Sequence, residues 1–161
     1  MIYNSLFTLF LCYYLMGDNM KIAIANDHHG IEMKFKIMEY LKGKGIESLN
    51  LGCNEKDNVD YVDYAISLGE KVRSGECNLG ILICGTGIGM SIAANKMESI
   101  LAAKVNTVNE AKLCREHNQA NVMTLSEYTE NLFEVVDAFI NTKPSEEERH
   151  VRRYNKIMQI K

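Results

Sequence analysis

The chain has 161 residues, of which 47% are hydrophobic and 24% charged, with a single proline and a formal net charge of -3. This length suits one domain with a full hydrophobic core, and this composition excludes a disordered or low-complexity chain. No basic run is present that could release counterions from a phosphate backbone, so nucleic acid is not an expected partner.

The cysteines and histidines show no disulfide or metal-binding pattern. The five cysteines form no C-x-x-C pair, which argues against a disulfide framework and a zinc ribbon. The four histidines lack an H-E-x-x-H spacing. We therefore expect a protein of the reducing cytoplasm that needs neither a metal nor another cofactor. These residues are Cys12, Cys53, Cys77, Cys84, Cys114, His28, His29, His117 and His150.

Residues 1–19 contain the apolar run "SLFTLFLCYYLM". A membrane-spanning helix needs about 20 apolar residues, and "MIYN" lacks the basic start of a signal peptide. A second methionine, Met20, directly precedes "KIAIAND", which is typical of the first strand of a domain. We expect residues 1–19 to lie outside the fold, as an extension upstream of the true start, and residues 20–161 to form one domain. A loosely held N-terminal helix is the alternative, and no membrane interaction is expected.

From Met20 onward, short apolar runs alternate with longer amphipathic ones. The runs that predict strands are residues 21–26, 46–51, 79–84, 100–105 and 121–125. The stretches that predict helices are Ile31–Lys42, Tyr61–Arg73, Ile88–Lys96, Asn109–His117 and Thr129–Asn141, with a last helix after Pro144. Such alternation favours parallel strands joined by right-handed crossovers, in a sheet covered on both faces. The sequence therefore predicts a three-layer α/β/α sandwich with a five-stranded parallel, Rossmann-like sheet.

Two predicted strand ends carry polar or reactive side chains. In open α/β sheets, ligands bind in the crevice beyond the carboxyl ends of the strands. Asp27 and His28 follow the first predicted strand, and Cys84 ends the third, at the start of the loop "CGTGIG". We therefore expect a site at this edge of the sheet.

The glycine loop does not match three common phosphate-binding motifs. A P-loop would need a lysine that is absent. A dinucleotide site would need G-x-G-x-x-G after the first strand, whereas Gly85, Gly87 and Gly89 are spaced G-x-G-x-G after the third. A cysteine phosphatase of the C-x5-R type would need an arginine where Met90 stands.

What these motifs share is a row of backbone N–H groups at a helix N-terminus, aimed at a negative charge. The same field acts on Cys84, because a helix N-terminus lowers the pKa of a thiol and so favours a base or nucleophile. The alternative is that Cys84 is an inert buried residue that ends a core strand, as most free cysteines are. The residues alone leave these two interpretations about even.

Five motifs in chain order carry a family resemblance. They are "NDHHG" at 26–30, "DYVDYA" at 60–65, "GILICGTGIGMSIAANK" at 80–96, "REHN" at 115–118 and "RHVRR" at 149–153. Together they resemble the ribose-5-phosphate isomerase B family, which also includes galactose-6-phosphate isomerase subunits. The resemblance implies a metal-free interconversion of a phosphorylated aldose and ketose through a cis-enediolate.

The resemblance also implies roles for single residues. Cys84 is the base that moves a proton between C2 and C1, and Thr86 with the loop amides holds the developing oxyanion. His117 opens the sugar ring, assisted by Asp27. The implied substrate-binding residues are His28, Tyr61, Gly85, Gly87, Ile88, Gly89, Asn118, Arg149 and Arg153, among which His28 and the two arginines grip the phosphate and Asn118 holds the enediolate oxygens.

Each of these residues has a structural alternative. His117, near the end of a predicted helix, could simply cap carbonyl groups. Arg149 and Arg153 share a helix face and could clamp an anion, but on spacing alone a solvated face paired with Glu146 and Glu148 is favoured.

Other residues also have ordinary structural roles open to them. Asp27 could be a helix N-cap, and Tyr61 could be a core residue. His29 is expected to point to solvent. Cys53, Cys77 and Cys114 are interpreted as structural.

The chain departs from the family pattern at two positions. Val62 stands where many members have proline, which affects loop stiffness more than chemistry. Glu127 stands where members often carry a phosphate-binding arginine, and a carboxylate there would repel a dianion unless it points away. Family members are homodimers whose C-terminal helix reaches the neighbouring site, so a homodimer or a dimer of dimers with shared active sites is implied, with Arg149 and Arg153 in the partner's pocket.

Three functions follow as hypotheses. The first is an isomerase of ribose 5-phosphate. The second is an isomerase of a six-carbon sugar phosphate, such as galactose 6-phosphate or allose 6-phosphate. The third is a non-catalytic protein that binds a sugar phosphate, against which the presence of both Cys84 and His117 argues.

Overall fold

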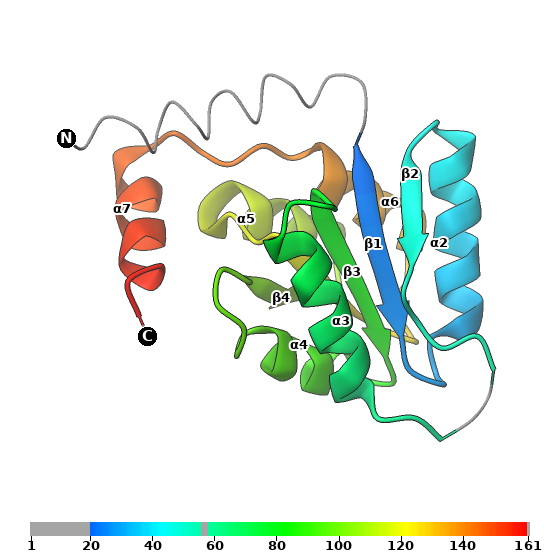
Figure 1. The fold of residues 1–161 in the computed structure, drawn as a ribbon. Coiled ribbons are helices and arrows are strands. Elements are labelled where there is room, and N and C mark those ends of the chain that lie inside the picture. The colour runs from blue at the N-terminus through cyan, green and yellow to red at the C-terminus, as the bar shows by residue number, and fades with distance from the viewer. Residues whose placement is uncertain (1–19, 56–57, 161) are drawn as a thin grey trace.

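The computed structural model describes residues 20–55 and 58–160, so the expectation about residues 1–19 lies outside the described part of the chain. Strands and helices alternate along the described residues (Figure 1). The strands are β1 (Lys21–Asn26), β2 (Glu47–Asn50), β3 (Leu79–Cys84), β4 (Ala102–Lys104) and β5 (Val122–Ser126). The helices are α2 (Ile31–Gly43), α3 (Tyr61–Arg73), α4 (Ile88–Ala94), α5 (Val108–Asn118), α6 (Leu132–Asn141) and α7 (Glu148–Ile157).

All four strand pairings are parallel, and the strand order is β2-β1-β3-β5-β4. β5 therefore lies between β3 and β4, although it follows both in the sequence. This confirms the predicted α/β fold with a five-stranded parallel sheet and flanking helices. Because all strands run the same way, their carboxyl ends meet at one edge of the sheet, the lower edge in Figure 1.

Alternating side chains of the strands bury two apolar layers, one on each face of the sheet. On one face, Ile22 and Ile24 of β1 pack with Phe139 of α6, and α2 and α5 also contribute to this layer. On the other, Leu82 and Cys84 of β3 pack with residues of α3 and α4. Every side chain of β3 is buried, which places this strand at the centre of the molecule.

The structure corrects several predicted boundaries. The helix predicted over 88–96 ends at Ala94 because the Asn95 side chain exchanges two hydrogen bonds with the backbone of Ala102, at 2.7 and 2.9 Å. The helix predicted from Thr129 begins at Leu132, because Thr129 closes a turn onto the Ser126 carbonyl. The strands predicted over 46–51 and 100–105 are shorter, at 47–50 and 102–104.

Helix ends follow ordinary capping chemistry where it bears on the site. Asp60 caps α3 by accepting a hydrogen bond from the amide of Val62, which fixes the start of α3 at Tyr61. Thr107 and Glu110 form a reciprocal capping box at the start of α5. No helix in residues 20–55 and 58–160 is long and apolar enough to cross a membrane.

Candidate active site

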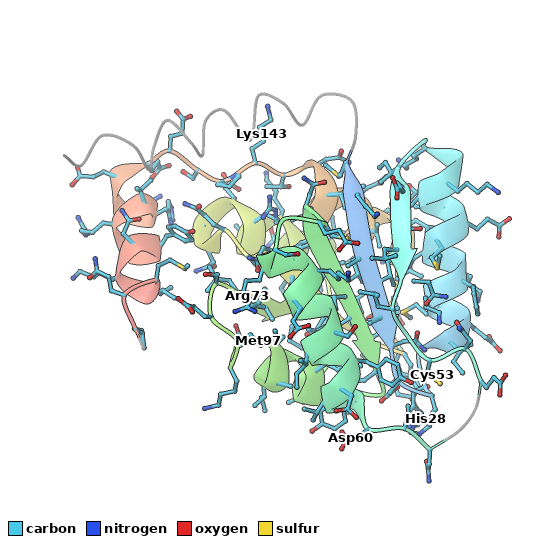
Figure 2. The ribbon with its side chains drawn as sticks, viewed as in Figure 1. His28, Cys53, Asp60, Arg73, Met97 and Lys143 are labelled. Atoms are coloured by element: carbon cyan, nitrogen blue, oxygen red, sulfur yellow. The ribbon has the colours of Figure 1, made fainter. Side chains whose placement is uncertain are left out.

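β1 and β3 are neighbours in the sheet, and the helices that follow them cover opposite faces. In open α/β sheets, a ligand-binding crevice is expected where such connections diverge, beyond the carboxyl ends of the two strands. The Asp27 amide donates to the Ile83 carbonyl at 3.1 Å, so the loop after β1 begins beside Cys84. Figure 2 shows His28, Cys53 and Asp60 at this same edge of the sheet, and Lys143 at the opposite edge.

The Cys84 side chain is buried, with 5% of its surface exposed, and faces α4. The Gly87 amide donates a hydrogen bond to Cys84 Sγ at 3.2 Å. The turn back toward the sulfur requires a left-handed backbone at Gly87, where φ is +74°. The glycine that follows Cys84 by three positions is thus what brings an amide to the sulfur.

β5 supports this loop from the other side. Thr124 donates its hydroxyl to the Gly87 carbonyl at 2.9 Å, and Ser126 donates its hydroxyl to the Gly85 carbonyl at 2.9 Å. These bonds occupy carbonyl groups, so the loop can present its N–H groups to a ligand. Sequence patterns gave no reason to link Thr124 or Ser126 to the loop.

The other loop residues reach the surface of the crevice. Thr86 is exposed, and its hydroxyl accepts a hydrogen bond from the Ile88 amide at 3.2 Å. Tyr61 is 39% exposed and lies against Gly89, where an added Cβ would come within 2.7 Å of the tyrosine Cζ. Tyr61 is therefore not the core residue that was its structural alternative.

The loop after β1 contributes a buried carboxylate and two histidines. Asp27 is 5% exposed and accepts a hydrogen bond from the His29 amide at 2.9 Å. The N-cap of α2 is Gly30, so the alternative role of Asp27 as a helix cap is wrong. His28 Nδ1 is buried and has no hydrogen-bond partner among the described residues.

Glu127 does not point away from the loop. Its Oε1 lies 3.2 Å from His29 Nδ1 and close to Gly85, where an added Cβ would be 3.7 Å from it. His29 is partly exposed, as expected, but it has a carboxylate partner that the sequence did not predict. His28, His29 and Glu127 also line an open groove of about 940 Å³ between α2 and α6.

His117 and Asn118 lie at the opposite edge of the sheet. α5 ends at Asn118, and the chain then enters the amino end of β5, where the Asn121 carbonyl accepts from the Gly80 amide. Cys84 is four residues further along β3 than Gly80, which is about 13 Å at the usual rise of a strand. Within one chain, His117 therefore lies near the end of β3 that is opposite to Cys84.

α7 stands beyond α5, apart from the sheet (Figure 1). Arg149 is exposed and pairs with Glu147 at 2.7 Å, and Arg153 is exposed. Arg152 pairs with Glu148 at 3.8 Å, as the spacing predicted. The two arginines assigned to the phosphate therefore also lie away from Cys84 of their own chain.

His150, between those arginines, is the residue of this helix that sequence reasoning passed over. It is buried, and its ring stacks on His117 with centroids 4.2 Å apart and planes 8° from parallel. Burial first, and then the charge of His117, lower the pKa of His150 below its ordinary value. The available signal was its position in "RHVRR", one residue after Arg149 and three residues before Arg153.

The comparisons with known proteins agree on one kind of relative. The chain matches the family model described as Ribose/Galactose Isomerase over residues 22–157. It is 37% identical to ribose-5-phosphate isomerase B of Escherichia coli over 143 residues, which covers 87% of this chain and 95% of the relative.

Two solved structures extend this likeness to the fold. Ribose 5-phosphate isomerase of Thermotoga maritima has a TM-score of 0.83 and 44% identity, over 88% of this chain and 99% of that one. Ribose-5-phosphate isomerase B of Mycoplasma genitalium, solved with bound ribulose-5-phosphate, has a TM-score of 0.81 and 41% identity, over 87% of this chain and 95% of that one.

No group of three or more potential metal ligands is present in the described part of the chain.

The Gly87 turn leads to a stability prediction. Gly87→Ala is expected to destabilise the fold by about 1–2 kcal/mol through its positive φ, and by about 1–3 kcal/mol more through overpacking, because the new Cβ would lie 3.0 Å from the Leu125 carbonyl carbon. Gly75→Ala is the matched control, since Gly75 has a φ of +78° and open space around it. Urea unfolding of both variants measures the difference, and equal losses would contradict the packing argument.

The buried histidine leads to a pH prediction. Because the folded pKa of His150 is lowered, its contribution to stability is full above pH 6.5, the ordinary value, and is lost as the pH falls through the folded pKa. His117, Arg149 and Arg153 oppose its protonation, and Glu147 favours it. Thermal unfolding between pH 8 and 5 should show a steeper loss below pH 6.5 in the wild type than in His150→Phe, which keeps a stacking ring. Parallel profiles would show that His150 does not titrate in this way.

Proposed function

The chain belongs to the ribose/galactose isomerase family, and we propose that it interconverts ribose 5-phosphate and ribulose 5-phosphate. The observation that carries the proposal is the Gly87 amide at 3.2 Å from Cys84 Sγ, at the mouth of a glycine loop. This arrangement places a sulfur that accepts an N–H hydrogen bond beside a row of N–H groups at a helix start. It suits a reaction in which a base creates an oxyanion within reach.

In the proposed reaction, the Cys84 thiolate takes the proton from C2 of the open-chain aldose. The electrons move into a C1–C2 double bond, and the charge settles on the oxygen at C1. The thiol then returns the proton to C1 as the C2 hydroxyl passes its own proton to O1, so no atom enters or leaves overall. The Gly87 and Ile88 amides already donate to Cys84 Sγ and Thr86 Oγ1. The other amides of the loop from Gly85 to Gly89 and the Thr86 hydroxyl stabilise the charged oxygen.

A complete site is proposed to need two copies of the chain. Cys84, Asp27 and His28 come from the carboxyl edge of one sheet, while His117 and Asn118 lie at the far edge of the same chain. If His117 opens the sugar ring and Asn118 holds the enediolate oxygens, both must come from a partner. The opposite edges of one chain would then serve two different sites.

Exposed apolar side chains support such a partner. Ile66 on α3 and Ile88 and Ile92 on α4 are 41%, 55% and 60% exposed, on the helices next to the Cys84 loop. Grouped apolar surface beside a site is typical of a protein interface. We propose that a second copy covers this surface and brings its α7 toward the loop.

The phosphate is proposed to bind to His28 and to Arg149 and Arg153 of the partner. Glu127 would repel a dianion, but His29 lies against its carboxylate and offsets that charge when the imidazole is protonated. Arginine side chains from the partner would supply the positive charge that this edge of the sheet needs. The affinity for phosphate therefore depends on assembly.

The first functional prediction concerns Cys84. With ribose 5-phosphate as substrate, Cys84→Ala should lower kcat by about 10²–10⁴-fold, because the proton loses its acceptor. Cys77→Ala should change kcat by less than about 3-fold, because burial raises the pKa of the Cys77 thiol and keeps it neutral. The rate of ribulose 5-phosphate formation measures both.

The same assay separates the alternatives. Galactose 6-phosphate and allose 6-phosphate should be turned over with a kcat/KM at least about 10-fold below that of ribose 5-phosphate, because an added carbon displaces the phosphate from its ligands. Faster turnover of a six-carbon sugar phosphate would show that the proposed substrate is wrong, while the proposed type of reaction would stand. Equal rates in wild type and Cys84→Ala would refute the mechanism.

The second functional prediction concerns the shared site. Cys84→Ala and His117→Ala should each retain only a small fraction of the wild-type activity when assayed alone. Refolded together in equal amounts, half of the pairs should be mixed, and each mixed pair should hold one intact site of two, so activity should recover to about a quarter of the wild-type value. No recovery from a mixture shown to contain mixed pairs would place His117 and Cys84 in separate functions.

A further inference from the structure

Lys34, on the first turn of α2, is fully buried. Its Nζ donates to the Cys53 carbonyl at 2.6 Å and to Asn54 Oδ1 at 2.7 Å. Its ammonium also lies 4.7 Å from the centre of the Phe35 ring. In the described part of the chain, all the groups that meet this cation are neutral oxygens or an aromatic ring.

A buried cation that pairs with no carboxylate of the described residues is costly to keep. Burial lowers the pKa of Lys34, because the ammonium has given up its water. An apolar side chain such as methionine would fill the same space without that cost. The presence of a lysine here, with its two hydrogen bonds, is therefore not explained by core packing alone.

Lys34 joins two loops at the carboxyl edge of the sheet. The Cys53 carbonyl also accepts from Asn26 Nδ2 at 3.1 Å, and the Cys53 amide donates to the Asn26 carbonyl at 3.1 Å. Asn26 Nδ2 also bonds to the Asp27 carbonyl at 2.6 Å. The loop after β2 is thus held against the loop that carries Asp27.

The approach of the two loops is close. An added Cβ at Gly52 would lie 2.5 Å from the Asn26 amide nitrogen, so only glycine fits there. Asn54 Oδ1, the second acceptor of Lys34, is also bonded to Asn50 Nδ2 at 2.9 Å, at the end of β2. Neutral oxygens gathered around one ammonium therefore hold residues 53 and 54 in place.

This segment leads into α3, which begins at Tyr61. Tyr61 lies against Gly89, inside the loop that starts at Cys84.

We propose that Lys34 is a positioning residue: its ammonium holds Cys53 and Asn54, in the connection from β2 to α3, against the β1–α2 loop, and this restraint helps keep Tyr61 over the Cys84 loop. The effect on catalysis rests on the proposed function, while the effect on the loop does not. Lys34 itself is not proposed to touch the substrate.

Cys53 gives a measure of the loop that is independent of activity. Its side chain is buried and its Sγ donates to the Glu55 carbonyl at 2.7 Å, so it can be alkylated only when the loop opens. In Lys34→Met, alkylation of Cys53 by iodoacetamide should be at least about 10-fold faster, while Cys77 and Cys114 keep their rates. Peptide mass spectrometry reads each cysteine separately.

The kinetic test pairs Lys34 with Tyr61. Lys34→Met should lower kcat/KM for ribose 5-phosphate by about 10–100-fold, mainly through KM, because a small displacement of a binding side chain is enough. In a Tyr61→Ala background the same change should cost less than about 2-fold, since Lys34 acts through Tyr61. Lys36→Met, on the exposed side of the same helix, is the matched control and should leave both readouts unchanged.

A second variant covers the case in which Lys34→Met fails to fold. Asn54 is exposed, so Asn54→Ala removes one acceptor without disturbing the core, and should speed alkylation of Cys53 by about 3–5-fold. Unchanged Cys53 alkylation in a folded Lys34→Met or in Asn54→Ala would overturn the proposal. The proposal would also be overturned if Lys34→Met lowered kcat/KM by the same factor in the Tyr61→Ala background as in the wild type. A wild type inactive on all three sugar phosphates, with faster Cys53 alkylation in the variants, would refute the proposed function and leave the loop contact standing.

Discussion

The left-handed turn at Gly87 is the constraint on which the candidate site depends. Only this backbone conformation returns an amide to Cys84 Sγ while α4 begins at the next residue. Two hydroxyl groups from β5 hold the carbonyls of the same turn, so the loop is braced by the neighbouring strand as well as by its own helix. A flexible glycine loop would place its amides at random, whereas this one has few conformations left to it. Preorganised N–H groups of this kind are what stabilise a charge that appears during a reaction.

Much of the fold could be predicted because its signals are local. Apolar runs of strand length alternate with amphipathic runs of helix length, and that alternation already implies parallel strands and two covered faces. The errors lie at element ends, where a side chain decides the outcome. The Asn95 side chain forms a hydrogen bond with the backbone of the edge strand β4 instead of extending α4, and the Thr129 side chain closes a turn onto the Ser126 carbonyl. Such competition depends on residues that meet only after folding.

The candidate site was predictable in part for the same reason. Cys84 and its glycines are contiguous, so their geometry could be expected, whereas the pairs His29 with Glu127 and His117 with His150 join distant segments. Lys34 left a signal that pattern reading did not use. It precedes Ile37 by three residues and Leu41 by seven, so a charged residue occupies the buried stripe of α2. A lysine at such a position marks a polar contact inside the core.

The strand order has a consequence for how the chain folds as it is made. β1, β2 and β3 can pair with one another once residue 84 has emerged, but among the described strands β4 pairs with β5 alone, which ends at residue 126. Until then, one edge of the fully apolar β3 has no neighbouring strand, and β4 has none at all. An unpaired apolar edge is a template for aggregation, so the nascent protein is most vulnerable while residues 85–126 are being synthesised. A chain that stopped before β5 would lose the strand that joins β4 to β3, and with it the hydroxyl groups that brace the Cys84 loop.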